Sequence, residues 1–484
     1  MPEYKTPGVY IQEIPHLPPS IASVETAIPA FIGYTEKAEW KVPDDLLNKP
    51  WRIQSMLEYE QYFGLPDSET TSISVTFSGP ANDPVINAAV DEKTRSKYFM
   101  HYSMQMFFAN GGGPCWITSV GNYKTPDKGV EISLLTIGLA EVAKINEVTL
   151  LLFPDSMNIA TAADYYTLHT LAINQCFELQ DRFVIMDVFR TPENEKVWRK
   201  DIINDEPGKG LRNILSGDTP HLKYAAAYFP RTYVGVDYYY KMIVAGKAVD
   251  NDAAVRLING PGGNDNLAKL EKGNNALYYR AKAAINDLEM LLPVAPAIAG
   301  VYAAVDEARG VWKAPANVNV VNAIRPEVLI SNEDQKDLNV DPQDGKSVNV
   351  IRSFQGRGPA IVWGGRTLAG NDNEWRYISV RRFFIMVEES VKNATQQFVF
   401  EPNDENTWVR IKSMIQNYLT KQWRDGALMG ASVKEAFYVH IGLNQTMSEL
   451  DILEGRLIIQ IGMAVVRPAE FIILQFMHKM LSES

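Results

Sequence analysis

Cysteine, histidine and long apolar runs are all scarce in this chain. Only two cysteines, Cys115 and Cys176, occur among 484 residues, which excludes a disulfide scaffold and predicts two reduced thiols. No apolar run approaches the roughly 18–20 residues that cross a bilayer, so no direct membrane insertion is predicted. The N-terminus, Met-Pro-Glu-Tyr-Lys-Thr-Pro, lacks the apolar stretch of a secretory signal, and we expect the chain to be made and folded in the cytoplasm.

Basic residues are in the minority. Lysine and arginine total 47 against 58 aspartates and glutamates, which gives a net charge of −11. General binding to nucleic acid or to an anionic membrane needs a basic surface, so no nucleic-acid partner is predicted. The net charge does not exclude a local basic surface. The apolar share of 46% and the charged share of 22% are those of a globular protein. At roughly 100–200 residues a domain, the length predicts two to four structural units.

Motifs of the common enzyme classes are also missing. The six histidines form neither an i,i+4 pair nor a His-Glu-x-x-His motif, so a zinc site of the usual type is not expected. Gly345-Lys346-Ser347 resembles the end of a phosphate loop, but Val340 stands where that loop needs its first glycine. Neither G-x-G-x-x-G after a strand nor G-x-S-x-G occurs. We therefore predict no catalytic residue, no cofactor and no metal.

Strand and helix patterns alternate between residues 21 and 236. Two helical windows, Ile132–Lys144 and Ala162–Leu179, separate runs typical of buried strands. These runs are Ala30–Tyr34, Cys115–Val120, Val148–Phe153, Phe183–Phe189 and Tyr224–Phe229. The alternation predicts an α/β fold with a mostly parallel sheet covered on both faces. Such sheets often bind nucleotides, so an α/β nucleotide- or small-molecule-binding enzyme is an alternative function.

The rest of the chain divides by composition. Residues 1–20 are rich in proline and predict an extended N-terminal arm with one short strand, Gly8-Val9-Tyr10-Ile11-Gln12-Glu13-Ile14. Residues 237–292 read as a polar, helical insertion or connector, and residues 293–370 read as a loop-rich return segment. Residues 371–484 form a C-terminal domain that ends in a strand-like arm.

Two amphipathic helices are predicted in that last domain. The first carries an apolar stripe from Val380 to Ala394, and the second a stripe from Trp408 to Leu419. On the opposite face of the second helix, Arg410, Asn417, Lys421 and Arg424 align at i, i+7, i+11 and i+14, and no acid follows before Asp425. This basic stripe is either a solvated face or a docking face for an acidic partner.

The C-terminal end is apolar on both faces. Leu457–Ile461 and Phe471–Met477, which includes Phe471, Ile472, Ile473 and Leu474, read as strands separated by Arg467-Pro468. A strand this apolar would be an aggregation template at an exposed edge, so it must be covered by this chain or by another subunit. Together with the N-terminal strand, both termini suit β-augmentation, in which one chain's strand joins another chain's sheet.

Several ordered motifs resemble the contractile tail sheath family. They are Tyr4–Ile14, Glu25–Thr35, Ala299–Ala303 with Asp306, Arg309–Asn317, Trp363–Leu368, Tyr377–Arg382, Phe400–Asn403 and Arg467–Phe471. The resemblance covers both ends and everything after about residue 293, and it is weak from about 40 to 290.

This resemblance implies a structural subunit and no enzyme. Sheath subunits stack as six-fold helical rings around an inner tube and contract to drive that tube through a target envelope. The family's terminal segments form a discontinuous α+β assembly domain with the α/β region inserted between them, and exchanged arm strands complete a shared sheet. The implied partners are the chain itself, the inner tube protein, and baseplate and terminator or cap proteins, and the basic stripe is the candidate tube contact.

One chain here carries both the N-terminal arm and the C-terminal motifs. Type VI secretion sheaths divide these between two chains, so a phage tail or a phage-tail-like injection system is favoured. The fit of Pro7–Tyr10 and Glu25–Thr35 favours the injection system, assembled in the bacterial cytoplasm and then released. A capsid-like or non-contractile filament protein is the other structural alternative.

Overall fold

The computed structural model describes residues 21–475, except 81, 124–128, 192–196, 203–209, 216, 242, 245–246, 249–250, 262, 264 and 342–344. The predicted N-terminal strand Gly8–Ile14 and the end of the predicted C-terminal strand therefore lie outside the described residues. The described chain forms two compact units. The small unit comprises residues 21–24 and 386–466, and the large unit comprises residues 25–385 and 467–475.

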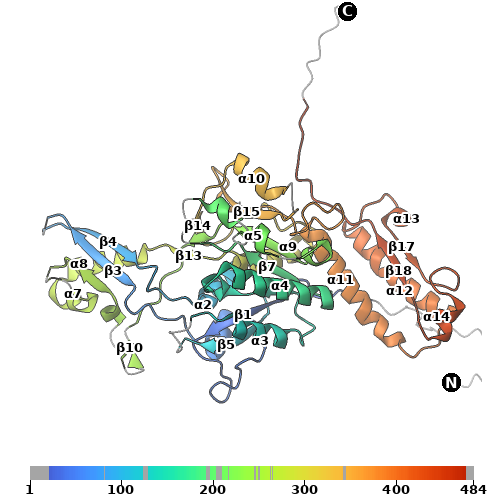
Figure 1. The fold of residues 1–484 in the computed structure, drawn as a ribbon, viewed down its shortest axis with the longest axis horizontal. Coiled ribbons are helices and arrows are strands. Elements are labelled where there is room, and N and C mark those ends of the chain that lie inside the picture. The colour runs from blue at the N-terminus through green and yellow to red at the C-terminus, as the bar shows by residue number, and fades with distance from the viewer. Residues whose placement is uncertain are drawn as a thin grey trace, which may run out of the picture. The chain divides into compact units, whose positions relative to one another are not determined.

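An eight-stranded sheet forms the centre of the large unit (Figure 1). Its strand order is β16-β15-β8-β7-β6-β1-β5-β2. The strands are β1 (Pro29–Thr35), β2 (Trp51–Ile53), β5 (Cys115–Asn122), β6 (Leu150–Leu152), β7 (Phe183–Asp187), β8 (Ala225–Phe229), β15 (Val348–Phe354) and β16 (Gly358–Trp363). The inner strands are parallel, and β2 and β16 at the two edges run antiparallel. Every residue of β1, β6, β7 and β8 is buried, as expected for parallel strands covered on both faces.

The direction of strand addition reverses beside β1. From β1 the chain goes to β5 on one side, then crosses to β6 on the other side and continues outward through β7, β8 and β15. The carboxyl ends of β1 and β6 therefore form a topological switch point, which is where doubly wound sheets bind ligands.

Helices cover both faces of this sheet. The helices that pack on its strands include α2 (Met100–Ala109), α3 (Ile132–Val142), α4 (Ala162–Leu179) and α9 (Ala295–Arg309). The Phe31 ring lies 5.1 Å from the Phe107 ring of α2, whereas Gly138 of α3 is so close to Ile32 that an added Cβ would lie 2.6 Å from its Cγ2 atom. Because consecutive strand residues point to opposite faces, α2 and α3 lie on opposite faces. The predicted α/β class with a parallel sheet is thus confirmed.

Two three-stranded sheets and a hairpin complete the strands of the large unit. Their orders are β12-β3-β4, β13-β9-β14 and β10-β11. The strands are β3 (Ile73–Ser78), β4 (Val85–Val90), β9 (Thr232–Val234), β10 (Ile243–Val244), β11 (Lys247–Ala248), β12 (Arg256–Ile258), β13 (Met290–Leu292) and β14 (Ala323–Pro326). The remaining helices are α1 (Met56–Phe63), α5 (Leu211–Ile214), α6 (Thr219–Leu222), α7 (Leu267–Gly273), α8 (Asn275–Asn286) and α10 (Asn332–Asn339), with 3-10 turns η1 (Pro154–Asn158), η3 (Trp198–Asp201) and η4 (Asn251–Ala254).

Two segments contain strands that their sequence did not predict. Residues 237–292 hold the helices α7 and α8 but also β12, which pairs in parallel with β3, and β13. Residues 293–370 are not merely loop-rich, because β15 and β16 join the main sheet. The periodicity of β15 is interrupted by Asn349, whose buried amide donates to the carbonyl oxygens of Ala227 and Arg366. These partners are distant in the chain, so no local pattern indicates the strand.

The small unit contains both predicted amphipathic helices. They are α11 (Ile378–Thr395), which begins in the large unit, and α12 (Glu405–Arg424). The unit also holds η5 (Gln396–Phe398), α13 (Val433–Ala436), α14 (Glu449–Leu453), β17 (Phe437–His440) and β18 (Gln460–Met463). β18 overlaps the predicted strand Leu457–Ile461 but begins later, at Gln460.

Both cysteines are thiols in the described structure. Cys115 and Cys176 are free and buried, and burial raises the pKa of both thiols. In the described part of the chain, no helix is both long enough and apolar enough to cross a membrane.

His169 makes the stability of the large unit depend on pH. It is buried in α4, its Nδ1 atom lies 2.9 Å from the carbonyl oxygen of Tyr165, and burial lowers its pKa to about 4. An unfolded histidine takes up its proton near pH 6.5, so the unfolded state binds more protons between pH 6.5 and 4. Stability should therefore fall with decreasing pH in this window, by at most about 1.4 kcal/mol per pH unit from this group.

Urea unfolding of the wild type and of His169→Gln between pH 7 and 4.5 measures this effect. Glutamine does not titrate, so the variant should lose stability less steeply than the wild type as the pH falls. Parallel pH profiles would contradict the assignment.

Candidate assembly surfaces

Helix α12 has one buried face and one exposed face. Asp404 caps its N-terminus by accepting a hydrogen bond of 2.9 Å from the Thr407 amide. Its inward side chains are buried and include Ile411, Ile415 and Leu419. The helix packs on β17 through this face, within the small unit (Figure 1).

The predicted basic stripe lies on the exposed face of α12. Arg410, Asn417, Lys421 and Arg424 are all exposed. Arg410 is weakly engaged within the unit, because its guanidinium lies 5.2 Å from the Phe398 ring centre and 3.9 Å from a Glu401 carboxylate oxygen. The helix begins earlier than its apolar stripe indicated and includes an acid, Glu405, in its first turn. Between Glu405 and Asp425 the sequence has no further acid, so the three basic residues of the stripe have no acid among them on this helix.

The strands β17 and β18 form a two-stranded sheet with two outer edges. Phe437 pairs with Met463 and His440 with Gln460 in antiparallel register. The Ala464 amide donates to the Ala436 carbonyl at 2.8 Å, so the alternation of an antiparallel ladder directs the amides of Val439 and Ile461 away from each other, toward the outer edges. Among the described residues each strand has only this one ladder partner. An isolated two-stranded sheet is marginally stable, and these edges can accept further strands.

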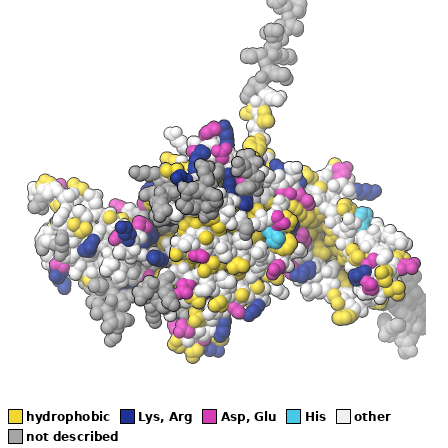
Figure 2. Space-filling view, in the orientation of Figure 1, with side chains coloured by type: hydrophobic (Ala, Val, Ile, Leu, Met, Phe, Trp, Pro, Cys, Tyr) yellow, Lys and Arg dark blue, Asp and Glu magenta, His cyan; other side chains and the backbone are white. Residues whose placement is uncertain are grey.

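The C-terminal segment leaves the large unit with its apolar side chains exposed. Phe471, Ile472, Ile473 and Leu474 are 72%, 80%, 81% and 73% exposed, and the hydrophobic side chains on the described part of this tail are visible in Figure 2. Within residues 467–475 the segment belongs to no strand. Its root is held by Glu470, whose carboxylate binds the Arg366 guanidinium through contacts of 3.0 and 2.5 Å. The exposed apolar run therefore begins at a fixed point.

The chain that follows the N-terminal arm is also held, here by the small unit. The Val24 amide donates to the Ser390 hydroxyl at 3.0 Å, and the Ser23 hydroxyl lies 3.2 Å from the hydroxyl of Tyr418 in α12. Burial raises the pKa of Tyr418, so this phenol stays protonated near neutral pH. The sequence did not predict either of these two attachments, although Glu470 and Arg366 lie in motifs that carried the family resemblance.

The switch point of the main sheet is occupied by a side chain of the chain itself. Asp155, just after β6, accepts hydrogen bonds from the amides of Tyr34 at 2.7 Å, Phe99 at 2.5 Å and Met100 at 3.1 Å. Burial raises its pKa to about 7, against the effect of these three amides. The end of β1 and the start of α2 would be the donors for a bound phosphate in a nucleotide site. In this structure these amides already donate hydrogen bonds to Asp155, so they are not available to bind a phosphate.

Replacing Asp155 by asparagine should destabilise the large unit by about 1–3 kcal/mol, the cost of leaving a buried amide unsatisfied. Both carboxylate oxygens accept hydrogen bonds, but asparagine has only one oxygen and would turn its NH₂ group toward the Tyr34 amide or toward those of Phe99 and Met100. Urea unfolding measures the change, with Asp237→Asn at an exposed position as the control. Equal midpoints for the two variants would contradict the role of Asp155.

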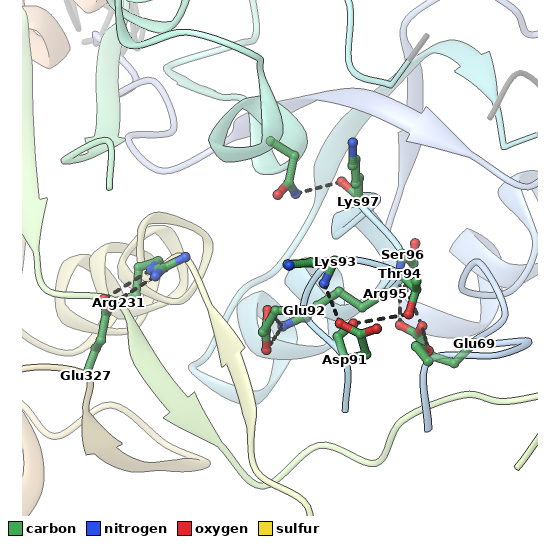
Figure 3. A network of polar contacts seen from close by, with 12 residues as sticks. Glu69, Asp91, Glu92, Lys93, Thr94, Arg95, Ser96, Lys97, Arg231 and Glu327 are labelled. Atoms are coloured by element: carbon green, nitrogen blue, oxygen red, sulfur yellow. Dashed lines mark hydrogen bonds and ion pairs between the residues drawn. The ribbon is translucent and has the colours of Figure 1, made fainter. Parts of the chain in front are cut away.

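A second group of carboxylates surrounds the connection from β4 to α2: Asp91 and Glu92 lie in that connection, and Glu69 comes from the segment before β3 (Figure 3). Glu69 accepts a hydrogen bond of 3.2 Å from the Ser96 amide, Asp91 accepts one of 3.0 Å from the Lys93 amide, and Glu92 pairs with Arg95 at 3.2 Å. Burial raises the pKa of Glu69. These contacts order a connection in the chain, and across the described residues no three His, Cys, Asp or Glu side chains are grouped so as to hold a metal ion.

Solved structures of two contractile machines resemble the whole chain. The helical sheath of the anti-feeding prophage in its contracted state is 28% identical, with a TM-score of 0.61 over 98% of this chain and 100% of that one. The contracted sheath complex of the extracellular contractile injection system PVC is 26% identical, with a TM-score of 0.61 over 99% of both chains. The phage tail sheath C-terminal domain family matches residues 370–478.

The whole chain is similar to contractile sheath proteins, and residues 370–478 match the tail sheath C-terminal domain family. The tail sheath protein of Vibrio phage KVP40 is 30% identical over 138 residues, which are 28% of this chain and 20% of the phage protein. The alignment thus spans about a fifth of that curated relative. The residues that match the family model, 370–478, include α11, α12, the β17–β18 sheet and the described C-terminal segment.

Proposed function

We propose that this chain is the structural subunit of a contractile sheath. It polymerises as six-fold helical rings around an inner tube and contracts to drive the tube through a target envelope. The observation that carries this proposal is the full-length likeness to two sheaths in the contracted state. A heterologous interface that does not close generates such a helix, and two packings of one lattice can store the free energy released on contraction.

The terminal arms are proposed to link neighbouring subunits. The N-terminal strand, Gly8–Ile14, and the C-terminal segment, Phe471–Leu474, would add to the outer edges of the β17–β18 sheet of other copies. Two features support this. Within the described part of the chain no third strand pairs with β17 or β18, and the C-terminal segment exposes four large apolar side chains that require cover. Such a shared sheet would keep the lattice connected while the subunits rearrange.

The basic stripe on α12 is proposed to contact the inner tube. Its exposed positions and the absence of a strong ion pair at Arg410 support an intermolecular role. The favoured tube surface is acidic, because the stripe is a local positive region on a chain of net charge −11. Baseplate and terminator or cap proteins are the further proposed partners, and the role is structural rather than enzymatic.

The structural likeness to injection-system sheaths also supports the choice of machine. We propose a phage-tail-like injection system that assembles in the bacterial cytoplasm and is then released as a particle. Genes for a baseplate, a tube and an AAA ATPase beside this gene, without capsid genes, would support that assignment, whereas capsid genes would indicate a phage tail.

Negative-stain electron microscopy of the chain produced together with its tube protein tests the function. The expected result is one population of long, narrow sheaths and one of short, wide sheaths. Filaments of a single width under all conditions would instead indicate a non-contractile assembly. Thermal-shift screening with nucleotides tests the enzyme alternative, and Asp155 at the switch point predicts no shift.

A further inference from the structure

The chain passes between its two units at three places. These are the bonds Val24–Glu25, Ile385–Met386 and Val466–Arg467. The second crossing lies inside helix α11, so a continuous helix belongs to both units. Within a single subunit, a force on one unit is transmitted to the other through these covalent connections.

Two of these connections meet at one aspartate of the large unit, whose side chain is 7% exposed. Thr26 stands just after the first crossing and Arg382 just before the second, and Asp306 in α9 binds both. The Arg382 guanidinium holds the Asp306 carboxylate in a bidentate pair with contacts of 3.0 and 2.5 Å. The Thr26 hydroxyl donates to the same carboxylate at 2.6 Å, and Arg382 also donates to the Thr26 carbonyl at 2.9 Å.

The cluster extends into the main sheet. The Arg382 guanidinium lies 4.5 Å from the centre of the Tyr302 ring, and the Tyr302 hydroxyl lies 2.8 Å from that of Tyr228 in β8. Both tyrosines are fully buried. A chain of directional contacts therefore runs from the start of α11, through α9, to a central strand.

The third connection has its own ion pair, between a buried arginine and a half-buried glutamate. Glu470, close after the crossing at Val466–Arg467, binds Arg366, whose side chain is 4% exposed. A buried ion pair is a weak source of net stability compared with apolar packing, but its geometry is specific and breaking it leaves a buried charge without its partner. The ion pairs beside these connections therefore fix the position of the chain more than they add to the free energy of unfolding.

We propose that Thr26, Asp306 and Arg382 form a mechanical anchor that holds the first two connections on the large unit while the sheath contracts. This role rests on the proposed function. The three are positioning residues: they keep the start of α11 and the chain entering β1 together on the sheet, so that a pull from the small unit acts on the sheet as a whole.

Hydrogen exchange on the isolated full-length subunit tests the anchor without any sheath. In Asp306→Asn, amides of residues 26–28 and 378–386 should exchange at least about tenfold faster than in the wild type, while β7 and β8 change little, because only the local opening becomes easier. Asp181→Asn is the matched control, since it disrupts another buried arginine–aspartate pair, with Arg182, at an Nε–Oδ1 distance of 2.6 Å. It should leave both connections as in the wild type.

Unchanged exchange at both connections in Asp306→Asn would overturn the anchor, as would an equal increase there in the control. Thr26→Val removes only one hydroxyl and replaces Asp306→Asn in this test if Asp306→Asn fails to fold. It should speed exchange around residues 26–28 more than in α11, and an unchanged rate there would count against the cluster.

Contraction tests the mechanical part. Sheaths of Asp306→Asn should assemble in the extended form and then break or stop part-way on contraction, whereas control sheaths contract as the wild type does. Complete contraction of intact Asp306→Asn sheaths would refute the mechanical role. If the wild type forms no sheath, the proposed function fails, and the exchange experiment still decides whether the cluster holds the connections.

Discussion

Deletion of residues 2–14 is expected to leave a folded, soluble subunit that no longer polymerises. This stretch is short and bounded by prolines, so it cannot bury its own apolar side chains and contributes little to the fold of its own subunit. The outer edges of β17 and β18 would remain without an incoming strand, and the backbone hydrogen bonds between copies would be lost. Circular dichroism should be unchanged, while electron microscopy should show no tubes.

A pair of point variants separates strand pairing from simple shortening. Ile11→Pro removes one amide donor and should reproduce the loss of tubes, because proline cannot complete a ladder in the middle of a strand. Ile11→Val keeps the amide and a β-branched side chain, and it should polymerise like the wild type. Tubes formed by the deletion variant would show that the arm does not link the subunits.

Reversal of Arg410, Lys421 and Arg424 to glutamate is expected to weaken binding to the inner tube by at least about hundredfold. Each exposed ion pair contributes about 0.5–1 kcal/mol, and reversal replaces that attraction by repulsion of similar size, so three positions together cost about 3–6 kcal/mol, more than the roughly 2.7 kcal/mol of a hundredfold change. The fold should survive, because all three side chains are exposed. Sedimentation of subunits with preformed tubes measures the binding.

The charge change itself needs a control. Lys144, Lys269 and Lys336 on the large unit are 67%, 69% and 67% exposed at their side chains, and reversing them changes the net charge by the same amount. This control should bind tubes as the wild type does. Wild-type binding should also weaken as salt is raised, since exposed charges are screened. Normal extended sheath–tube complexes of the stripe variant would rule out α12 as the tube contact.

Local patterns were sufficient wherever an element is long or fully buried. The apolar runs predicted β1, β5, β7 and β8, and the window Ala162–Leu179 coincides with α4. The helical periodicity of α12 predicted the alignment of the basic stripe opposite the apolar face, and the stripe is exposed. Strands of three residues, such as β12, and the interrupted β15 have no periodicity to detect, because their stability comes from partners far away in the chain.

The proposed anchor could not be predicted from spacing either. Thr26, Asp306 and Arg382 lie in three separate motifs, and nothing local indicates that they share one carboxylate. The same holds for Arg366 with Glu470. Each residue alone reads as an ordinary polar position, and burial of the charges becomes visible only when the segments come together.

The sequence by itself determined the α/β class, the sheath-like motifs and the alignment of the basic residues on one helix, because periodicity and composition are local properties. Only the tertiary structure decided the rest. It showed that, among the described residues, β17 and β18 pair only with each other, that Asp155 fills the switch point, and where the chain is held beside its crossings. These features depend on contacts between segments far apart in the chain. Polar groups that are buried on folding need hydrogen-bond partners, and here those partners come from distant segments.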